Sequence, residues 1–170
     1  AAASDVYKRQ HYRYMAYQCT WYFSQLPEKV VDLIEKDLTE SSTIPDTHWV
    51  GGLVWHYIDR ANRENFLYNI SHLDGDSVKF KKYNEGDGQT WHVDAKPQEE
   101  GDEDVRKISF TVQLSDYDDY EGGNVQFLDE AGSMYNMPRK RGTVALFDSA
   151  TRHRVNKVTK GTRKSLVGWA

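Results

Sequence analysis

The stretch from Ile108 to Leu114, ISFTVQL, alternates apolar and polar side chains along its whole length. Successive side chains of a β-strand point to opposite faces, so this period of two predicts a strand. From Ser77 to the end of the chain, short β-branched segments are separated by Gly, Asp and Asn, with turn signals about every ten residues. That spacing indicates an all-β sandwich or barrel in the C-terminal half.

Further strands are predicted on both sides of this stretch, from the same β-branched and aromatic composition. Turns and loops between them are predicted at 84–89, 95–104 and 116–123, where Gly, Asp and Pro gather. The predicted strands span residues 78–83, 91–94, 124–128, 142–147, 153–158 and 163–169.

The N-terminal half has a helical pattern instead. A first strand is expected within 12–23, and a helix over 27–38, where Val30, Ile34 and Leu38 recur at helical spacing after Pro27. A second helix is predicted over 53–66. Helices first and strands after predict an α+β fold, a double-stranded β-helix (jelly roll) with the N-terminal helices packed on one face.

The chain of 170 residues is interpreted as one domain over 11–170, after a leader at 1–10 without periodicity. Helical support is expected over about 24–70 and the jelly-roll core over about 77–170. The net charge of −4 argues against a sequence-independent nucleic-acid binder, although basic residues gather at 139–141 and 152–164. These form either a solvated rim or a platform for an acidic substrate.

A single cysteine, Cys19, is compatible with a reducing compartment. The sequence shows neither a secretory signal pattern nor an apolar run of about 18 residues, the length that spans a membrane. We therefore expect a cytoplasmic protein without a membrane partner.

His92 and Asp94 are the first candidates for a functional site. In an extended backbone the two side chains point the same way, which places an imidazole beside a carboxylate. His153, after the predicted strand 142–147, is the candidate for a third ligand. Two His and one carboxylate form the ligand set of non-haem Fe(II) oxygenases, although such a pair alone also arises by chance.

Arg163 and Ser165 share one face of the last predicted strand with Val167 and Trp169. A guanidinium and a hydroxyl at this spacing can clamp a carboxylate, as a 2-oxoacid with a distal carboxylate would require. Tyr83 ends the strand before His92 and can reach the same pocket. The alternatives are an Arg in a basic surface tail and a half-buried aromatic residue.

The order of these residues resembles the 2-oxoglutarate/Fe(II)-dependent dioxygenases, specifically their prolyl 4-hydroxylase-like branch of microbial or phage type. The resemblance covers residues 78–170 well and the helices more loosely. Arg163 stands where collagen-type enzymes have Lys, Asp148 stands where many relatives have Pro, and the chain stops at Ala170. The matching residues are Tyr83, Gly86, His92, Asp94, Leu114, Tyr120, Gly122, Gly123, Phe147, His153, Val155, Gly161, Arg163, Ser165 and Trp169.

This resemblance implies an Fe(II)- and 2-oxoglutarate-dependent dioxygenase that hydroxylates a peptidyl residue, proline first, and releases succinate and CO2. His92, Asp94 and His153 would hold Fe(II), and 2-oxoglutarate would chelate it through its keto acid. The far carboxylate would pair with Arg163, helped by Ser165 and Tyr83. O2 is the second cosubstrate, and ascorbate is a candidate reductant.

A protein or peptide is the expected partner, nucleic acid is not, and no oligomeric state is predicted. Three alternatives remain open: a related hydroxylase acting on lysine, a small molecule or nucleic acid; a catalytically silent jelly-roll binding module; and a zinc-dependent hydrolase. In a zinc hydrolase, Arg163 and Ser165 would have no purpose.

Overall fold

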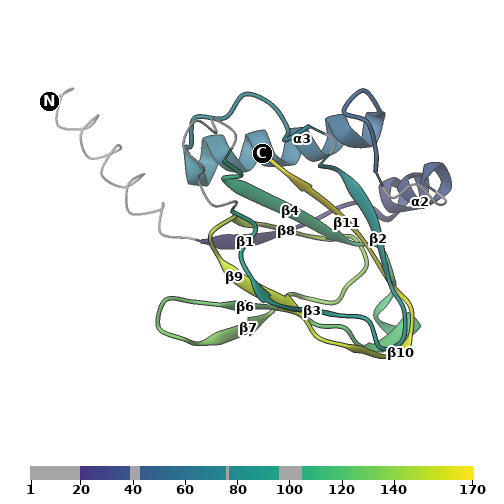
Figure 1. Cartoon of the computed structure of the whole chain (residues 1–170). Helices are drawn as coiled ribbons and strands as arrows, with labels where there is room; N and C mark the ends of the chain where they lie inside the picture. Colours follow the sequence, from purple (N-terminus) through teal and green to yellow (C-terminus); the bar gives the residue numbers. More distant parts are fainter. Residues whose placement is uncertain (1–19, 39–42, 76, 96–104) are drawn as a thin grey trace, which may run out of the picture.

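Two antiparallel sheets face each other in the computed structural model, which describes residues 20–38, 43–75, 77–95 and 105–170 (Figure 1). The larger sheet has the strand order β1-β8-β4-β11-β2, and the smaller has the order β3-β9-β6-β7. The larger contains β1 (Trp21–Gln25), β8 (Thr143–Asp148), β4 (Ile108–Gln113), β11 (Arg163–Trp169) and β2 (Lys79–Tyr83). The smaller contains β3 (Gln89–His92), β9 (Arg152–Val155), β6 (Val125–Leu128) and β7 (Met134–Asn136).

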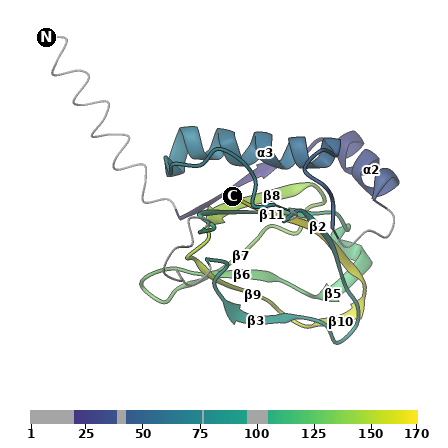
Figure 2. The same ribbon diagram turned by 45° about the horizontal axis from the view of Figure 1, so that its top comes forward.

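Helices α2 (Glu28–Asp37) and α3 (Trp49–Ala61) lie on the outer face of the larger sheet, and the smaller sheet lies on its other side (Figure 2). This arrangement confirms the predicted α+β jelly roll with helices on one face. The main apolar core fills the space between the helices and this sheet, and includes Ile34, Val54, Phe110 and Leu166. Within the described parts of the chain, no helix combines the length and apolar character needed to cross a membrane.

Helix α2 confirms the predicted helix to within a residue at each end. Helix α3 begins at Trp49, four residues earlier than predicted, because His48 caps it by accepting a hydrogen bond from the Val50 amide. Gly51 is required in its first turn, since a Cβ there would lie 2.9 Å from the Asp46 carbonyl oxygen. The helix continues as a π-helical turn, η1 (Asn62–Phe66), to the predicted end.

Several strands differ from the prediction. The region 116–123, predicted as a turn, contains the 3₁₀ turn η2 (Tyr117–Asp119) and β5 (Tyr120–Gly122). The predicted strand 153–158 is divided between β9 and β10 (Val158–Gly161), and β10 pairs with β5. Strand β7 was not predicted. Strand β1 covers only the last three residues of the predicted range 12–23 and continues to Gln25, and residues 12–19 of that range are outside the described residues. The predicted leader, 1–10, and most of the acidic loop 95–104 are also outside them.

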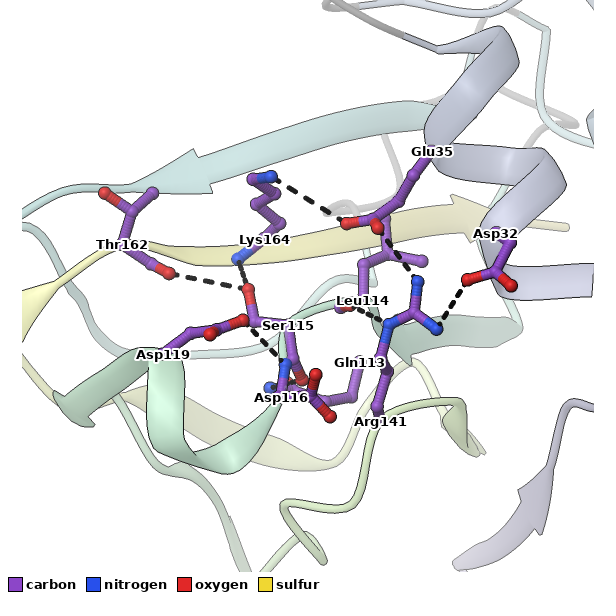
Figure 3. A network of polar contacts seen from close by, with 10 residues as sticks. All are labelled: Asp32, Glu35, Gln113, Leu114, Ser115, Asp116, Asp119, Arg141, Thr162 and Lys164. Atoms are coloured by element: carbon purple, nitrogen blue, oxygen red, sulfur yellow. Dashed lines mark hydrogen bonds and ion pairs between the residues drawn. The ribbon is translucent and has the colours of Figure 1, made fainter. Parts of the chain in front are cut away.

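Arg141 ties helix α2 to the edge of the jelly roll (Figure 3). Its guanidinium donates to the Leu114 carbonyl at 3.0 Å and lies 3.0 Å from Asp32 and 2.9 Å from Glu35. Lys164 also approaches Glu35, at 3.8 Å. The basic residues of 139–141 are therefore not a uniform rim or platform, because Arg141 binds the body of the protein while Lys140 is exposed.

We expect Arg141→Met to lower the free energy of unfolding by about 1–3 kcal/mol, because it strips charge-assisted donors from a partly buried network. Urea denaturation of the two proteins measures the difference. Lys140→Met, at the exposed neighbour, is the matched control and should leave the midpoint unchanged. Equal midpoints for wild type and Arg141→Met would show that the contacts of Arg141 with helix α2 and Leu114 do not stabilise the fold.

Candidate active site

His92, Asp94 and His153 meet in the space between the two sheets. Their potential ligand atoms all lie within 4.8 Å of one another. Asp94 Oδ1 is 3.3 Å from His92 Nε2 and 3.4 Å from His153 Nε2. The two histidines are paired across β3 and β9, which brings their rings to 4.1 Å between centroids. The cluster that the sequence predicted is thus assembled from distant segments.

The prediction that Asp94 shares a strand with His92 is wrong. Strand β3 ends at His92, and the chain then turns, with the amides of Asp94 and Ala95 each donating to the Ser149 carbonyl at 2.9 Å. The turn still directs the Asp94 carboxylate back toward both histidines. Long-range backbone pairing with Ser149, rather than strand alternation, positions this residue.

Both histidines present Nε2 to the centre of the cluster. His92 Nδ1 lies 2.7 Å from the Thr90 carbonyl oxygen, and His153 Nδ1 lies 2.9 Å from that of Thr151. A carbonyl only accepts, so each Nδ1 carries the proton and each Nε2 has a free lone pair when the ring is neutral. Metal-ligating histidines are oriented in this way.

Asp94 is held through its other oxygen. Its Oδ2 accepts hydrogen bonds from Ser109 Oγ at 2.8 Å and from Trp169 Nε1 at 2.9 Å. This leaves Oδ1 directed to the histidines. Ser109 lies on the polar face of β4 and contacts Ser149 Oγ at 2.9 Å. Sequence reasoning missed Ser109 and Ser149, and placed Trp169 only on the same strand face as Arg163 and Ser165.

The carboxylate of Asp94 is strongly held in its charged form. Burial favours the neutral acid, but hydrogen bonds from His153 and His92, which Nε2 can donate only when the imidazole is protonated, outweigh burial and hold the pKa of Asp94 well below its ordinary value. The hydrogen bond to Asp94 raises the pKa of His92, with burial acting in the opposite direction. A charged oxygen between two imidazole nitrogens suits a divalent cation, so these residues fit a metal.

Arg163 lies at the far end of the same pocket, buried to 2% exposure. Its Nε donates to Gln113 Oε1 at 3.1 Å, and its guanidinium carbon lies 5.6 Å from the centre of the Tyr83 ring. Among the described residues, its Nη2 has no hydrogen-bond partner. Burial lowers the pKa of Arg163, yet a guanidinium stays charged in proteins.

A buried cationic donor without a partner is costly, and a carboxylate from a ligand would satisfy it. Tyr83 and Ser165 line the pocket with Arg163, as predicted, and burial raises the pKa of the Tyr83 phenol. Gln113, which accepts the hydrogen bond from Arg163, was not among the predicted site residues. Its own side chain is held in place because Nε2 donates to Tyr120 Oη at 2.8 Å. The pocket therefore combines a metal cluster with a buried cationic donor, and these two features suit the two ends of a dicarboxylate.

Asp148, the departure from the family pattern, closes the turn beside the site. Its carboxylate accepts from the Ala150 amide at 2.8 Å and from the Tyr68 hydroxyl. Burial, followed by this hydrogen bond, raises the pKa of Tyr68 to about 12. The carboxylate therefore stabilises the turn that carries Ser149, where a proline would stiffen it differently.

Residues 78–170 match the family model of the 2OG-Fe(II) oxygenase superfamily. The chain belongs to this superfamily. The predicted family, its dioxygenase class, and Fe(II), 2-oxoglutarate and O2 as its cofactors are thereby confirmed at the level of the family. Ascorbate and the cytoplasmic location stay predictions.

Known relatives place this 2OG-Fe(II) oxygenase domain near hydroxylases. A PKHD-type hydroxylase of Synechococcus sp. (strain CC9902) is 36% identical over 94 residues, 55% of this chain and 40% of the relative. One of Picosynechococcus sp. (strain ATCC 27264 / PCC 7002 / PR-6) is 44% identical over 62 residues, 36% of this chain and 28% of the relative. The chain thus spans less than half the length of these curated relatives.

Solved structures confirm the fold. A Pseudomonas putida prolyl-4-hydroxylase superposes with a TM-score of 0.71 at 19% identity, covering 88% of this chain and 83% of that one. A viral collagen prolyl hydroxylase from Paramecium Bursaria Chlorella virus-1 gives 0.65 at 18%, covering 88% and 94%. At this identity the likeness concerns the jelly roll alone.

We expect Ser109→Ala to weaken metal binding about 10–100-fold, because the residues that orient a metal ligand contribute at this scale. A titration with Mn²⁺, followed by calorimetry, measures the change. Ser24→Ala, on edge strand β1 of the same sheet, is the control and should bind as wild type does. A Ser109→Ala protein with unchanged affinity would show that Trp169 alone orients Asp94.

Proposed function

We propose that this domain is an Fe(II)- and 2-oxoglutarate-dependent dioxygenase that hydroxylates a peptidyl residue, with proline the first candidate. The observation that carries the proposal is a single pocket. It holds the His92–Asp94–His153 cluster at one end and, at the other, Arg163, whose Nη2 has no hydrogen-bond partner among the described residues. A zinc hydrolase would need the cluster but not the buried arginine.

Each residue has a distinct task in this proposal. His92, Asp94 and His153 would hold Fe(II) on one side and leave the remaining positions open. Arg163, with Ser165 and Tyr83, would bind the far carboxylate of 2-oxoglutarate and so orient its keto acid toward the metal. When bound, Fe(II) supplies the oxidising chemistry in which 2-oxoglutarate and O2 yield succinate, CO2 and a hydroxylated substrate.

The walls of the pocket keep water from the reaction. Phe147 packs edge-on against the His153 ring, with 4.7 Å between centroids, and Val125 and Val155 line the same space. Exclusion of water strengthens the electrostatic contacts of Arg163 and Asp94 with their ligands. These apolar residues thus serve the site as well as the smaller core cluster to which they belong.

Proline is favoured as the target by the names of the relatives. Two structural neighbours are prolyl hydroxylases, and another is a prolyl hydroxylase from Trichoplax adhaerens in complex with a hypoxia inducible factor peptide fragment. Hydroxylation of lysine, a small molecule or nucleic acid is the alternative within the same chemistry. A catalytically silent binding module is the alternative outside it.

A succinate-release assay with Fe(II) and 2-oxoglutarate tests the proposal. We expect release above background with one or more proline-containing peptides, and an added mass of one oxygen on the peptide. The matched peptide with alanine in place of proline should gain none. Oxygen addition to a lysine peptide alone would overturn the choice of proline, and absence of 2-oxoglutarate binding by metal-loaded protein would overturn the dioxygenase.

A further inference from the structure

Lys81 is a basic residue of the pocket to which the mechanism above gives no role. It lies in the middle of β2, where it pairs with Ser165 of β11, next to the pair formed by Tyr83 and Arg163. Lys81 lines the pocket together with His92, Asp94 and Arg163. The next residue, Lys82, is exposed, as the alternation of a strand requires.

The strand register places Lys81 toward the metal end of the pocket. Its partner Ser165 lies two residues beyond Arg163 on β11, in the direction of Trp169, whose Nε1 donates to Asp94. Burial lowers the pKa of Lys81, and the negative charge of Asp94 opposes this. Burial lowers the pKa of Arg163, and the charged or polar groups that act on it are Tyr120, Tyr83 and Arg139.

The pocket therefore has a cation at each end. Arg163 lies with Tyr83 and Gln113 at the far end, and Lys81 lies near the metal cluster. In the part of the chain that the structure describes, the Lys81 ammonium forms no hydrogen bond or ion pair. A half-buried ammonium of this kind is stabilised when a ligand brings an opposite charge.

We propose that Lys81 binds the carboxylate of 2-oxoglutarate that lies beside the metal, so that the dianion is held between two cations. This inference rests on the proposed function and deepens it. A compact ammonium on a flexible stem can reach a carboxylate that also approaches a metal, whereas the planar fork of Arg163 suits the free carboxylate at the other end. Lys81 is a positioning residue for the keto acid.

Equilibrium binding tests this role without turnover. Mn²⁺ replaces Fe(II), its affinity is measured first for every variant, and 2-oxoglutarate is then titrated into the loaded protein and followed by calorimetry. We expect Lys81→Met to weaken 2-oxoglutarate binding about 10–100-fold, the scale of a hydrogen bond to a charged group. Lys81→Arg, which keeps the charge, should retain most of the affinity, and Lys82→Met should bind as wild type does.

A second ligand locates the contact. 2-Oxovalerate keeps the keto acid but lacks the far carboxylate. Lys81→Met should weaken binding of both ligands by a similar factor, whereas Arg163→Met should weaken only 2-oxoglutarate. A loss in Lys81→Met confined to 2-oxoglutarate would overturn the inference, because Lys81 would then act on the far carboxylate.

Two further outcomes separate this inference from the proposed function. Unchanged 2-oxoglutarate binding in Lys81→Met, with a raised requirement for the peptide, would assign Lys81 to the peptide and overturn the inference alone. Failure of the loaded wild-type protein to bind 2-oxoglutarate would overturn the proposed function and the inference with it.

Discussion

Asp94→Ala is expected to abolish 2-oxoglutarate turnover, reducing succinate release to background. Asp94 is the only carboxylate in the metal cluster formed by the described residues, and its Oδ1 lies within 3.4 Å of both histidine Nε2 atoms. Loss of a ligand should cost more than the roughly 10–100-fold seen when residues that orient ligands are removed. Succinate release and Mn²⁺ titration measure the two effects.

The same result is expected for His92→Ala and His153→Ala. Asp118→Ala, an exposed carboxylate in η2, and His56→Ala, an exposed imidazole on α3, are matched controls that should keep wild-type turnover. Circular dichroism confirms that each variant is folded. Full activity in any one of the three cluster variants would show that its side chain is not a ligand.

Arg163→Met is expected to raise the 2-oxoglutarate requirement about thirtyfold or more, because removing one partner of a buried charge pair costs about 2–5 kcal/mol. Arg163 is 2% exposed and its Nη2 has no partner among the described residues, so little else competes for the ligand carboxylate. The affinity for Fe(II) should stay within about twofold of wild type, since Arg163 is at the other end of the pocket. Turnover measured against each cofactor in turn separates the two quantities.

Arg163→Lys should fall between wild type and Arg163→Met, because a lysine keeps the charge but loses the planar fork. Lys164→Met, at the neighbouring and partly exposed position of β11, should leave the 2-oxoglutarate requirement unchanged. If Arg163→Met raised the requirements for 2-oxoglutarate and for iron equally, Arg163 would have a structural role and the carboxylate clamp would be wrong.

For strand β4, the local sequence pattern predicts the strand and its two faces but not the surroundings of each face. The alternation in Ile108–Leu114 predicts the strand and its two faces, because that period depends only on neighbouring residues. All six residues of β4 are nevertheless buried. Its polar face meets the smaller sheet, where Ser109 binds Asp94 and Gln113 binds Arg163. An alternation of apolar and polar residues cannot distinguish a polar face in contact with solvent from one that lines a pocket.

The element boundaries that were predicted wrongly share one cause, because each is set by a contact that the local hydrophobic pattern does not contain. Helix α3 starts early because the His48 side chain caps it and Gly51 lets it approach Asp46, and neither contact belongs to the apolar period. Strands β5 and β10 exist because they pair with each other across distant segments. At Gly122, φ is +72°, and a Cβ would lie 2.3 Å from the Lys157 carbonyl oxygen. That close approach becomes visible only when the two strands meet.

The sequence by itself determined the kinds of residue available to this protein, their order, and the family to which it belongs. His92, Asp94, His153 and Arg163 could be selected because their chemistry is specific and because strand and helix periods are local. Tertiary structure alone decided which oxygen of Asp94 faces the histidines, that Arg163 Nη2 has no partner among the described residues, and that Lys81 enters the same pocket. Those features arise from pairing between strands far apart in the chain, which no local pattern encodes.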